Sequence, residues 1–358
     1  PDWTVDMPHR LRFSIGYRIA GIALASACAL PLAGCYVLKQ GCSVIKYTHE
    51  AIPIKKLQNR PDTPDSLREF LRLVGEIRRF AADSIGLVRN GSFSTYVNID
   101  KTYLVDVVYG AGKLDFTPYQ WRFPFFGTFP YKGFFDRKDA QKEADRLIAK
   151  GYDAFIGRVD AFSTLGFFSD PLYSFMSRFS VYRIASLILH EQTHATIYYK
   201  NQAQFNEELA MFVGNEGALR FIRANYGDSS ERYINALHEQ KDDGEYFSLI
   251  KSLYRKLKSA YDGNGTEAEK LEVKRLIIRK FKDSISANYD SLFSSQAYRG
   301  MAAMDINNAL IAADMTYTYD LNWFYELYRK KNRDFRVMLA ILKKLKNKKG
   351  DIRKSLSL

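Results

Sequence analysis

The apolar and polar positions divide the chain into an N-terminal apolar segment, a strand-rich stretch and a long helical part. Leucines and phenylalanines recur at helical spacing between Ser66 and Asp83, which predicts an amphipathic helix. Between Ser92 and Phe135, aromatic and aliphatic residues alternate with polar ones and are interrupted by glycines and prolines. This alternation predicts short strands joined by turns.

The chain after this stretch is predicted to be mainly helical. A helix is expected near Asp139 to Lys150, an extended pair over Tyr152 to Phe168, and helix after helix from Val181 onward. Breaks in the helical part are expected near Asn201, Gly227, Gly263 and Asn288. Because the strands precede the helices without strict alternation, the pattern predicts a helix-dominated α+β fold.

The composition indicates a folded protein with anionic neighbours. Of its 358 residues, 46% are hydrophobic and 15% aromatic, and its three cysteines all lie near the N-terminus, so no disulfide framework is expected. The net charge is +13, with basic residues enriched between Lys343 and Lys354. Anionic lipid heads fit this charge better than nucleic acid, since no nucleic-acid-binding module is recognisable. A solvated helix end with a frayed tail also explains the C-terminal run.

The N-terminal segment has the pattern of a secretory signal. Three arginines precede an apolar stretch from Ile19 to Leu32 that is short and rich in small residues. The stretch ends in Leu32-Ala33-Gly34-Cys35, which resembles a bacterial lipobox, where a peptidase cuts before a cysteine that carries lipid. We therefore expect a signal peptide over 1–34 and a single domain over 35–358, anchored in the cell envelope by a lipid on Cys35. An uncleaved anchor helix is the alternative.

A metal-binding motif provides the most specific chemistry. The run His190-Glu191-Gln192-Thr193-His194 is an HExxH pattern on an apolar, helical background. Residues four apart share one helix face, so both imidazoles can reach one zinc ion while Glu191 activates the water that attacks a carbonyl. An accidental match on a surface helix is the alternative. The apolar run before His190 argues against it, because burying such polar side chains without a purpose is costly.

A catalytic zinc site needs a third protein ligand, and three glutamates follow the motif. Glu207 is our choice, because Asn206-Glu207-x-x-Ala210 resembles the second motif of zinc peptidases that use a glutamate ligand. Glu208 lies about 100° further around the predicted helix and is expected to be solvated. Glu216 is the second candidate, either as a ligand or as a partner that orients a histidine. Cobalt or manganese would also suit these ligands.

Five sequence blocks together form a recognisable set. They are Gly34-Cys35-Tyr36 with Pro53-Ile54, Phe129 to Asp136, Ala161 to Phe168 with Asp170-Pro171-Leu172, HExxH with Phe205-Asn206-Glu207, and Asn307-Asn308-Ala309 with Leu310 and Tyr317. In order and spacing they resemble the bacterial predicted-aminopeptidase family of zinc lipoproteins. Phe162, Phe167 and the pair Gln192-Thr193 depart from the expected residues, but none replaces a proposed ligand. The resemblance implies a zincin-like metallopeptidase domain with a small strand-rich region before the HExxH helix.

Further site residues can be assigned only as expectations. The residues Ser163, Thr164, Leu165 and Gly166 are predicted to form an extended edge that pairs with the substrate backbone, although an ordinary buried strand fits the same pattern. A tyrosine or histidine is usually needed to donate to the oxyanion, and Tyr317 is preferred over Tyr319 and His238. Asn308 is expected to support this pocket.

The predicted function is hydrolysis of peptide bonds by a lipid-anchored zinc peptidase, with Glu191 as general base and then as acid. The resemblance implies an aminopeptidase with a peptide substrate. Endopeptidase action stays open, because no carboxylate is singled out to bind the free ammonium of a substrate. A non-catalytic envelope binding or assembly protein on a peptidase scaffold is a different alternative, against which the presence of Glu191 argues.

Overall fold

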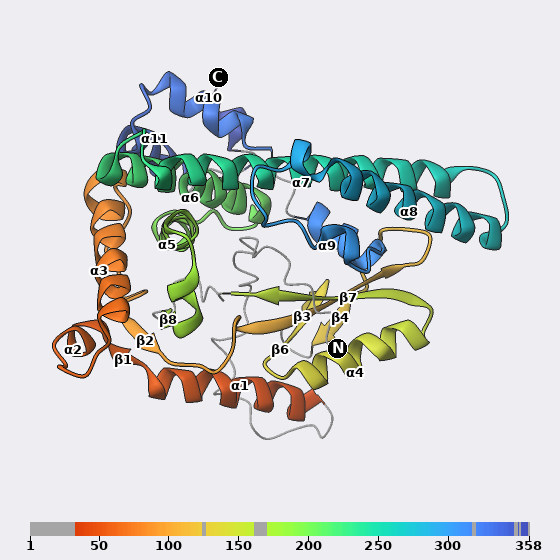
Figure 1. Cartoon of the computed structure of the whole chain (residues 1–358), viewed down its shortest axis with the longest axis horizontal. Helices are drawn as coiled ribbons and strands as arrows, with labels where there is room; N and C mark the ends of the chain where they lie inside the picture. Colours follow the sequence, from red (N-terminus) through yellow and green to blue (C-terminus); the bar gives the residue numbers. More distant parts are fainter. Residues whose placement is uncertain are drawn as a thin grey trace.

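The computed structural model describes residues 33–123, 127–160, 170–316, 320–346, 350 and 352–356. Within these ranges the chain is a helix-dominated α+β protein with three small sheets, as the sequence predicts (Figure 1). No described helix is both long and apolar enough to cross a membrane.

The N-terminal part contains more helix than expected. It begins with α1 (Ala33–Glu50), which the sequence analysis did not predict, followed by β1 (Ile52–Pro53) and α2 (Ile54–Gln58). The Tyr36 hydroxyl of α1 donates to the carbonyl of Gly133. This contact anchors α1 to the body of the protein, and it joins two of the blocks that carry the family resemblance.

The helix predicted from Ser66 to Asp83 is confirmed. It forms α3 (Asp65–Phe80) and continues into a π-helical turn, η1 (Ala81–Ile85), which ends at Gly86 in the left-handed region with a φ of 88°. The buried face of α3 consists of Phe70, Leu71, Val74 and Ile77. These positions follow the helical spacing from which the element was predicted.

The strand-rich region forms three sheets. Its strands are β2 (Thr95–Val97), β3 (Val105–Gly112), β4 (Trp121–Phe123), β5 (Gly127–Phe129), β6 (Tyr131–Phe134), β7 (Tyr152–Val159) and β8 (Leu172–Tyr173). In the sheet of order β6-β3-β7, the central β3 pairs antiparallel with both neighbours. The other sheets have the orders β1-β2-β8 and β4-β5. Of the extended pair expected over 152–168, β7 is described, and 161–169 lie outside the described residues.

The helical part follows the predicted breaks closely. Its helices are α4 (Arg137–Ala149), α5 (Val181–Thr196), α6 (Ala203–Tyr226), α7 (Glu231–Asp262), α8 (Glu267–Leu292), α9 (Asn308–Met315), α10 (Asn322–Lys330) and α11 (Phe335–Lys344). Short 3-10 turns are η2 (Ser174–Arg178), η3 (Met301–Ala303) and η4 (Arg353–Ser355). At Asn288 the break is a kink inside α8 rather than a helix end.

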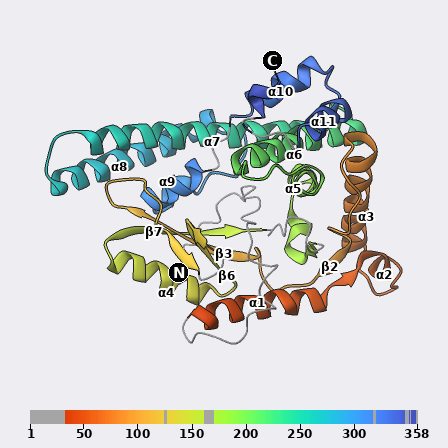
Figure 2. The ribbon, with the colours of Figure 1, turned by 180° about the vertical axis from the view of Figure 1, so that it is seen from behind.

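Helix α5 lies in the interior, with α6 packed along it and α3 and α7 also in contact with it (Figures 1 and 2). Its N-cap Ser180 accepts a hydrogen bond from the backbone N–H of Arg183 at 3.1 Å. Every residue from Ile184 to His194 is buried. A helix that is buried on all sides presents its polar side chains to protein rather than to bulk water, so those side chains need partners or a ligand.

Two glycines of α6 permit its close approach to α5. A Cβ added at Gly214 would lie 2.9 Å from the Ser186 carbonyl oxygen and 3.3 Å from the His190 Cβ. At Gly217 the added atom would lie 2.8 Å from the Leu189 side chain. The spacing between the two helices therefore depends on the absence of side chains at these positions.

We expect Gly214→Ala to lower the free energy of unfolding by about 1–3 kcal/mol, because the methyl group must push backbone atoms of α5 away. The measurement is denaturant unfolding followed by circular dichroism. Gly244→Ala on α7 is the matched control, since nothing lies within 4 Å of an added Cβ there. It should raise stability by about 0.5–1 kcal/mol through the lower entropy of the unfolded chain. Equal stability of Gly214→Ala and the native chain would contradict the prediction.

Candidate metal centre

The two histidines of the motif lie one turn apart on α5 and face each other. Their Nε2 atoms are 3.1 Å apart, and both side chains are buried. Helical spacing brings residues i and i+4 to one face, as the motif predicts. The pair is therefore preformed by local structure alone.

Glu207 completes the group from the first turn of α6. Its Oε2 lies 3.6 Å from the His190 Nε2, and its Oε1 lies 3.4 Å from the His194 Nε2. Among the described residues, these three buried side chains form a group whose donor atoms lie close enough together to hold a metal ion. The preference for Glu207 among the three glutamates thus agrees with the geometry.

The spacing of the donor atoms fits a tetrahedral metal ion. Donors that each lie ~2.1 Å from such an ion are about 3.3–3.4 Å from one another. The three measured separations, 3.1, 3.4 and 3.6 Å, lie close to this value. Two imidazoles and a carboxylate are also the chemistry that zinc prefers, so the residues present fit such an ion.

Asn206, next to Glu207, ties the first turn of α6 to the loop that precedes it. Its side-chain oxygen accepts from the Tyr199 N–H at 2.9 Å, and its amide nitrogen donates to the Tyr199 carbonyl at 2.8 Å. Tyr199 belongs to the loop that connects α5 to α6, where Asn201 adopts a positive φ of 63°. The paired hydrogen bonds set where α6 begins, and hence how its first turn meets α5.

Charge and burial set the protonation of the group. Burial lowers the pKa of His190 to about 4, with Glu207 opposing the shift. Burial alone would raise the pKa of Glu207, but His194 and the hydrogen bonds of both imidazoles lower it to about 2. Burial alone would lower the pKa of His194, but the charges of Glu207 and Glu191 raise it. Metal ligands must be deprotonated, so His194 is the ligand for which protons compete most strongly.

Glu191 lies beside the group and is 5% exposed. It follows His190 directly in the chain, and its charge acts on His194. A carboxylate at this place can accept a proton from a water molecule held by an ion between the three ligands. The structure therefore places all four residues of the proposed chemistry in one buried site.

The other two glutamates have different surroundings. The expectation that Glu208 is solvated is wrong: it is 1% exposed, accepts from the Gln204 amide at 3.0 Å and forms an ion pair with Arg353. The physical reason is that the C-terminal segment covers this face of α6. Glu216 lies two and a half turns beyond Glu207, since nine residues rotate by about 100° each, and so faces the opposite side. It is not part of the His-His-Glu group.

The other predicted site residues either lie outside the described residues or are not part of the His-His-Glu group. Tyr317, Tyr319 and the four residues Ser163, Thr164, Leu165 and Gly166 lie outside the described residues. His238 is on α7 and does not belong to the group. Cys35 lies within α1, and its predicted lipid stays a prediction.

Asn308 has a clear structural role. Its amide nitrogen donates to the carbonyls of Gly112, Lys113 and Asp115 at 2.9–3.1 Å, and its oxygen accepts from the Tyr261 hydroxyl at 2.8 Å. It is completely buried. These bonds tie α9 to the turn after β3, and its predicted support of a substrate pocket stays a prediction.

Sequence reasoning missed the roles of four residues at or near the site. Asn206 stands in a motif at the first turn of α6, and the motif does not show that its side chain bonds to the backbone of the preceding loop. The small residues Gly214 and Gly217, three apart on a helix, are a signal for close helix packing. Arg353 lies 145 residues from its partner Glu208, and no local pattern connects the two.

The fold and site together define an α+β protein with a buried His-His-Glu group that could hold a metal ion, beside a buried glutamate. A comparison with protein families agrees with this class. Residues 35–356 match the model of the family described as "Putative aminopeptidase", and the chain belongs to this family. No curated protein and no solved structure matches the chain significantly.

Proposed function

We propose that this protein is a zinc-dependent peptidase that removes residues from the N-terminus of peptides. The observation that carries the proposal is the buried convergence of His190, His194 and Glu207 with Glu191 beside them. The helix pair α5 and α6, one with HExxH and the other with the third ligand, also supports a zincin-like arrangement. Membership in the aminopeptidase family supports a peptide substrate.

In the proposed mechanism the chain's own residues hold the reactants and move the proton. A bound zinc ion would polarise the scissile carbonyl and lower the pKa of water. His190, His194 and Glu207 fix the position of that ion. Glu191 takes the proton from the attacking water and passes it to the leaving amine, so one carboxylate serves as base and then as acid. The buried surroundings strengthen these charge interactions relative to bulk water.

The aminopeptidase assignment is tested with matched peptides that have a free or an acetylated N-terminus. We expect single N-terminal residues to be released from the free peptide, and the acetylated peptide to be cleaved at least about tenfold more slowly. The reason is that loss of a charged hydrogen bond costs about 1.5–3 kcal/mol. Mass spectrometry of the products gives the cleavage position. Cleavage at internal bonds at equal rates in both peptides would identify an endopeptidase instead.

We further propose that a lipid on Cys35 anchors the protein in the cell envelope, facing the periplasm or the outer membrane. The lipobox-like run and the apolar segment before it support this proposal. In a bacterial host fed a fatty-acid analogue, the native chain should incorporate label and Cys35→Ala should not. Cys42→Ala is the matched control, because Cys42 is exposed and has no proposed lipid. Label that persists in Cys35→Ala would refute the anchor.

A further inference from the structure

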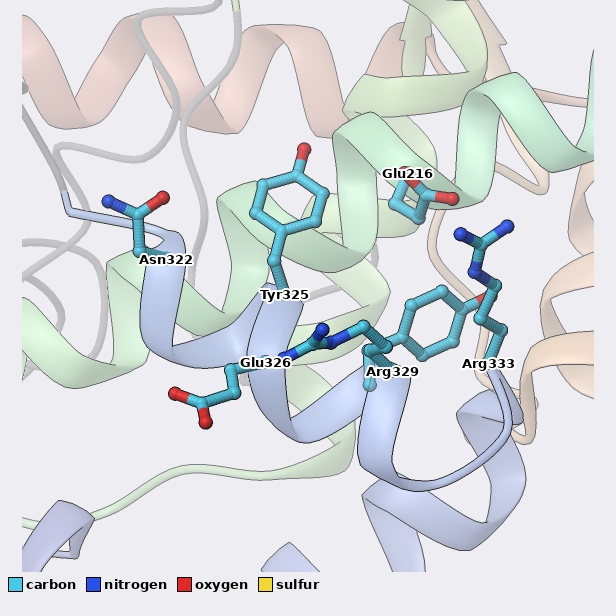
Figure 3. Close-up of a pocket in the computed structure, with 7 residues that line it drawn as sticks. Glu216, Asn322, Tyr325, Glu326, Arg329 and Arg333 are labelled. Carbon is cyan, nitrogen blue, oxygen red and sulfur yellow. The ribbon is translucent and has the colours of Figure 1, made fainter. Parts of the chain in front are cut away.

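A cavity of about 490 Å³ lies beside α6, away from the metal centre (Figure 3). Glu216 of α6 lines one wall, and residues of α10 and of the turn after it line the others. Glu216 was the second candidate for a metal ligand, but it faces the opposite side of α6 from Glu207. The cavity is therefore separate from the proposed active site.

Two packed tyrosine rings form one wall of the cavity. Tyr325 and Tyr328 line it, and both rings contact Phe212 behind them, with centroids 4.9 and 5.5 Å away. Tyr328 also contacts Phe335 at 4.5 Å. Packed aromatic rings give a ligand an apolar surface whose position is fixed.

The turn that carries Arg333 is held in an unusual conformation. Asn332 and Arg333 both have positive φ, 54° and 56°, which costs L-residues free energy. Arg220 of α6 fixes this turn, since its guanidinium donates to the Arg333 carbonyl at 3.0 Å and to the Tyr328 hydroxyl at 3.2 Å. The Arg333 N–H also donates to the Tyr328 carbonyl at 2.9 Å. The rim of the cavity is thus built by tertiary contacts.

Four charged side chains line the cavity, and one of them, Glu326, forms an ion pair with Lys330 at 3.4 Å. Among the other three, the positive charge of Arg333 acts on Glu216. Glu216 is half-buried, while Arg329 and Arg333 are exposed. Within the described residues, the side chains of Glu216, Arg329 and Arg333 form no hydrogen bond or ion pair with another protein group. Figure 3 shows the Glu216 carboxylate and the Arg333 guanidinium on the same side of the cavity, with Tyr325 between Asn322 and Glu216. Both signs of charge are available to a ligand there.

We propose that this cavity binds a small zwitterion, namely a free amino acid or a dipeptide. Its ammonium group would contact Glu216, and its carboxylate would contact the guanidinium group of Arg333, which lies on the same side of the cavity and can bind a carboxylate through two hydrogen bonds. An apolar side chain would rest against Tyr325 and Tyr328. The volume lies within the range of small-molecule sites. The proposal does not depend on the peptidase activity, because the metal ligands lie on the other face of α6.

Isothermal titration calorimetry of the protein as purified, with L-leucine and leucyl-leucine as probes, tests the site. The Glu191→Gln background prevents hydrolysis of the dipeptide. We expect binding of at least one probe, and at least tenfold weaker binding in Glu216→Gln and in Arg333→Gln. Arg223→Gln is the matched control, because Arg223 lies on α6 and pairs with Asp228 outside the cavity. It should bind like the parent protein.

Two analogues test the need for both charges. Isoamylamine lacks the carboxylate and 4-methylpentanoate lacks the ammonium group, so each should bind at least tenfold more weakly than L-leucine. Equal binding of inorganic phosphate and L-leucine, unchanged affinity in Glu216→Gln, or no heat from either probe at millimolar concentration would overturn the proposal. Metal content measured on the same samples should be unaffected by Glu216→Gln, which separates this site from the metal centre.

Discussion

Glu191→Gln should reduce kcat/KM for peptide hydrolysis by at least about a thousandfold while the protein keeps its metal. The amide has nearly the same size as the carboxylate but cannot accept the proton of the attacking water, and general acid–base catalysis contributes about 10²–10⁴ in rate. Glu191 accepts a proton when the water attacks and donates it when the amine leaves, so its loss affects two steps. The measurement is steady-state hydrolysis of a peptide with a free N-terminus, paired with metal analysis of the same sample.

Glu231→Gln is the control for this experiment, since Glu231 begins α7 and is exposed. It should hydrolyse the peptide at the native rate. If Glu191→Gln kept more than about a tenth of native activity with a full metal content, Glu191 would not be the general base, and another group would have to be sought.

Glu207→Ala should lose the bound metal. Removing one of three protein ligands leaves two histidines to hold the ion, and even the loss of an outer partner of a metal site costs about 10–100-fold in affinity. We therefore expect at least about hundredfold weaker binding, measured by competition with a chromophoric chelator and by metal content after dialysis. His190→Ala should behave in the same way, because it removes a ligand from the other helix.

Glu216→Ala separates the two candidates for the third ligand. Glu216 lines the cavity on the opposite side of α6, so the Glu216→Ala protein should retain about one metal ion per chain. Full metal retention in Glu207→Ala, with loss in Glu216→Ala, would reverse the assignment. Mass spectrometry of the native chain also identifies the ion, and a content of cobalt or manganese rather than zinc would correct the cofactor while leaving the ligand set intact.

Local sequence alone placed the two histidines and Glu191. Helical periodicity fixes which side chains share a face, so a spacing of four residues brings His190 and His194 together in any straight helix. The same local rules predicted α3, α4 and the breaks between the long helices. They did not predict α1, which follows directly on the apolar segment and ends shortly before Pro53.

The surroundings of the glutamates required the tertiary structure. A motif favoured Glu207, but its contact with both histidines depends on the close packing of α5 and α6 at Gly214 and on the Asn206 link to the intervening loop. Glu208 was expected in solvent because a helix position alone does not show what covers it. The covering group, Arg353, comes from the far end of the chain.

The sequence by itself therefore determined the helix-dominated α+β class, the buried HExxH helix and the place of both histidines on one face of that helix. Each of these depends on the period of a single element or on a short motif. The tertiary structure alone decided the distances of 3.4 and 3.6 Å from Glu207 to the two imidazoles, the burial of Glu208 and the place of Glu216 in a separate cavity. These features depend on contacts between residues far apart in the chain, and such contacts leave no periodic pattern in the sequence.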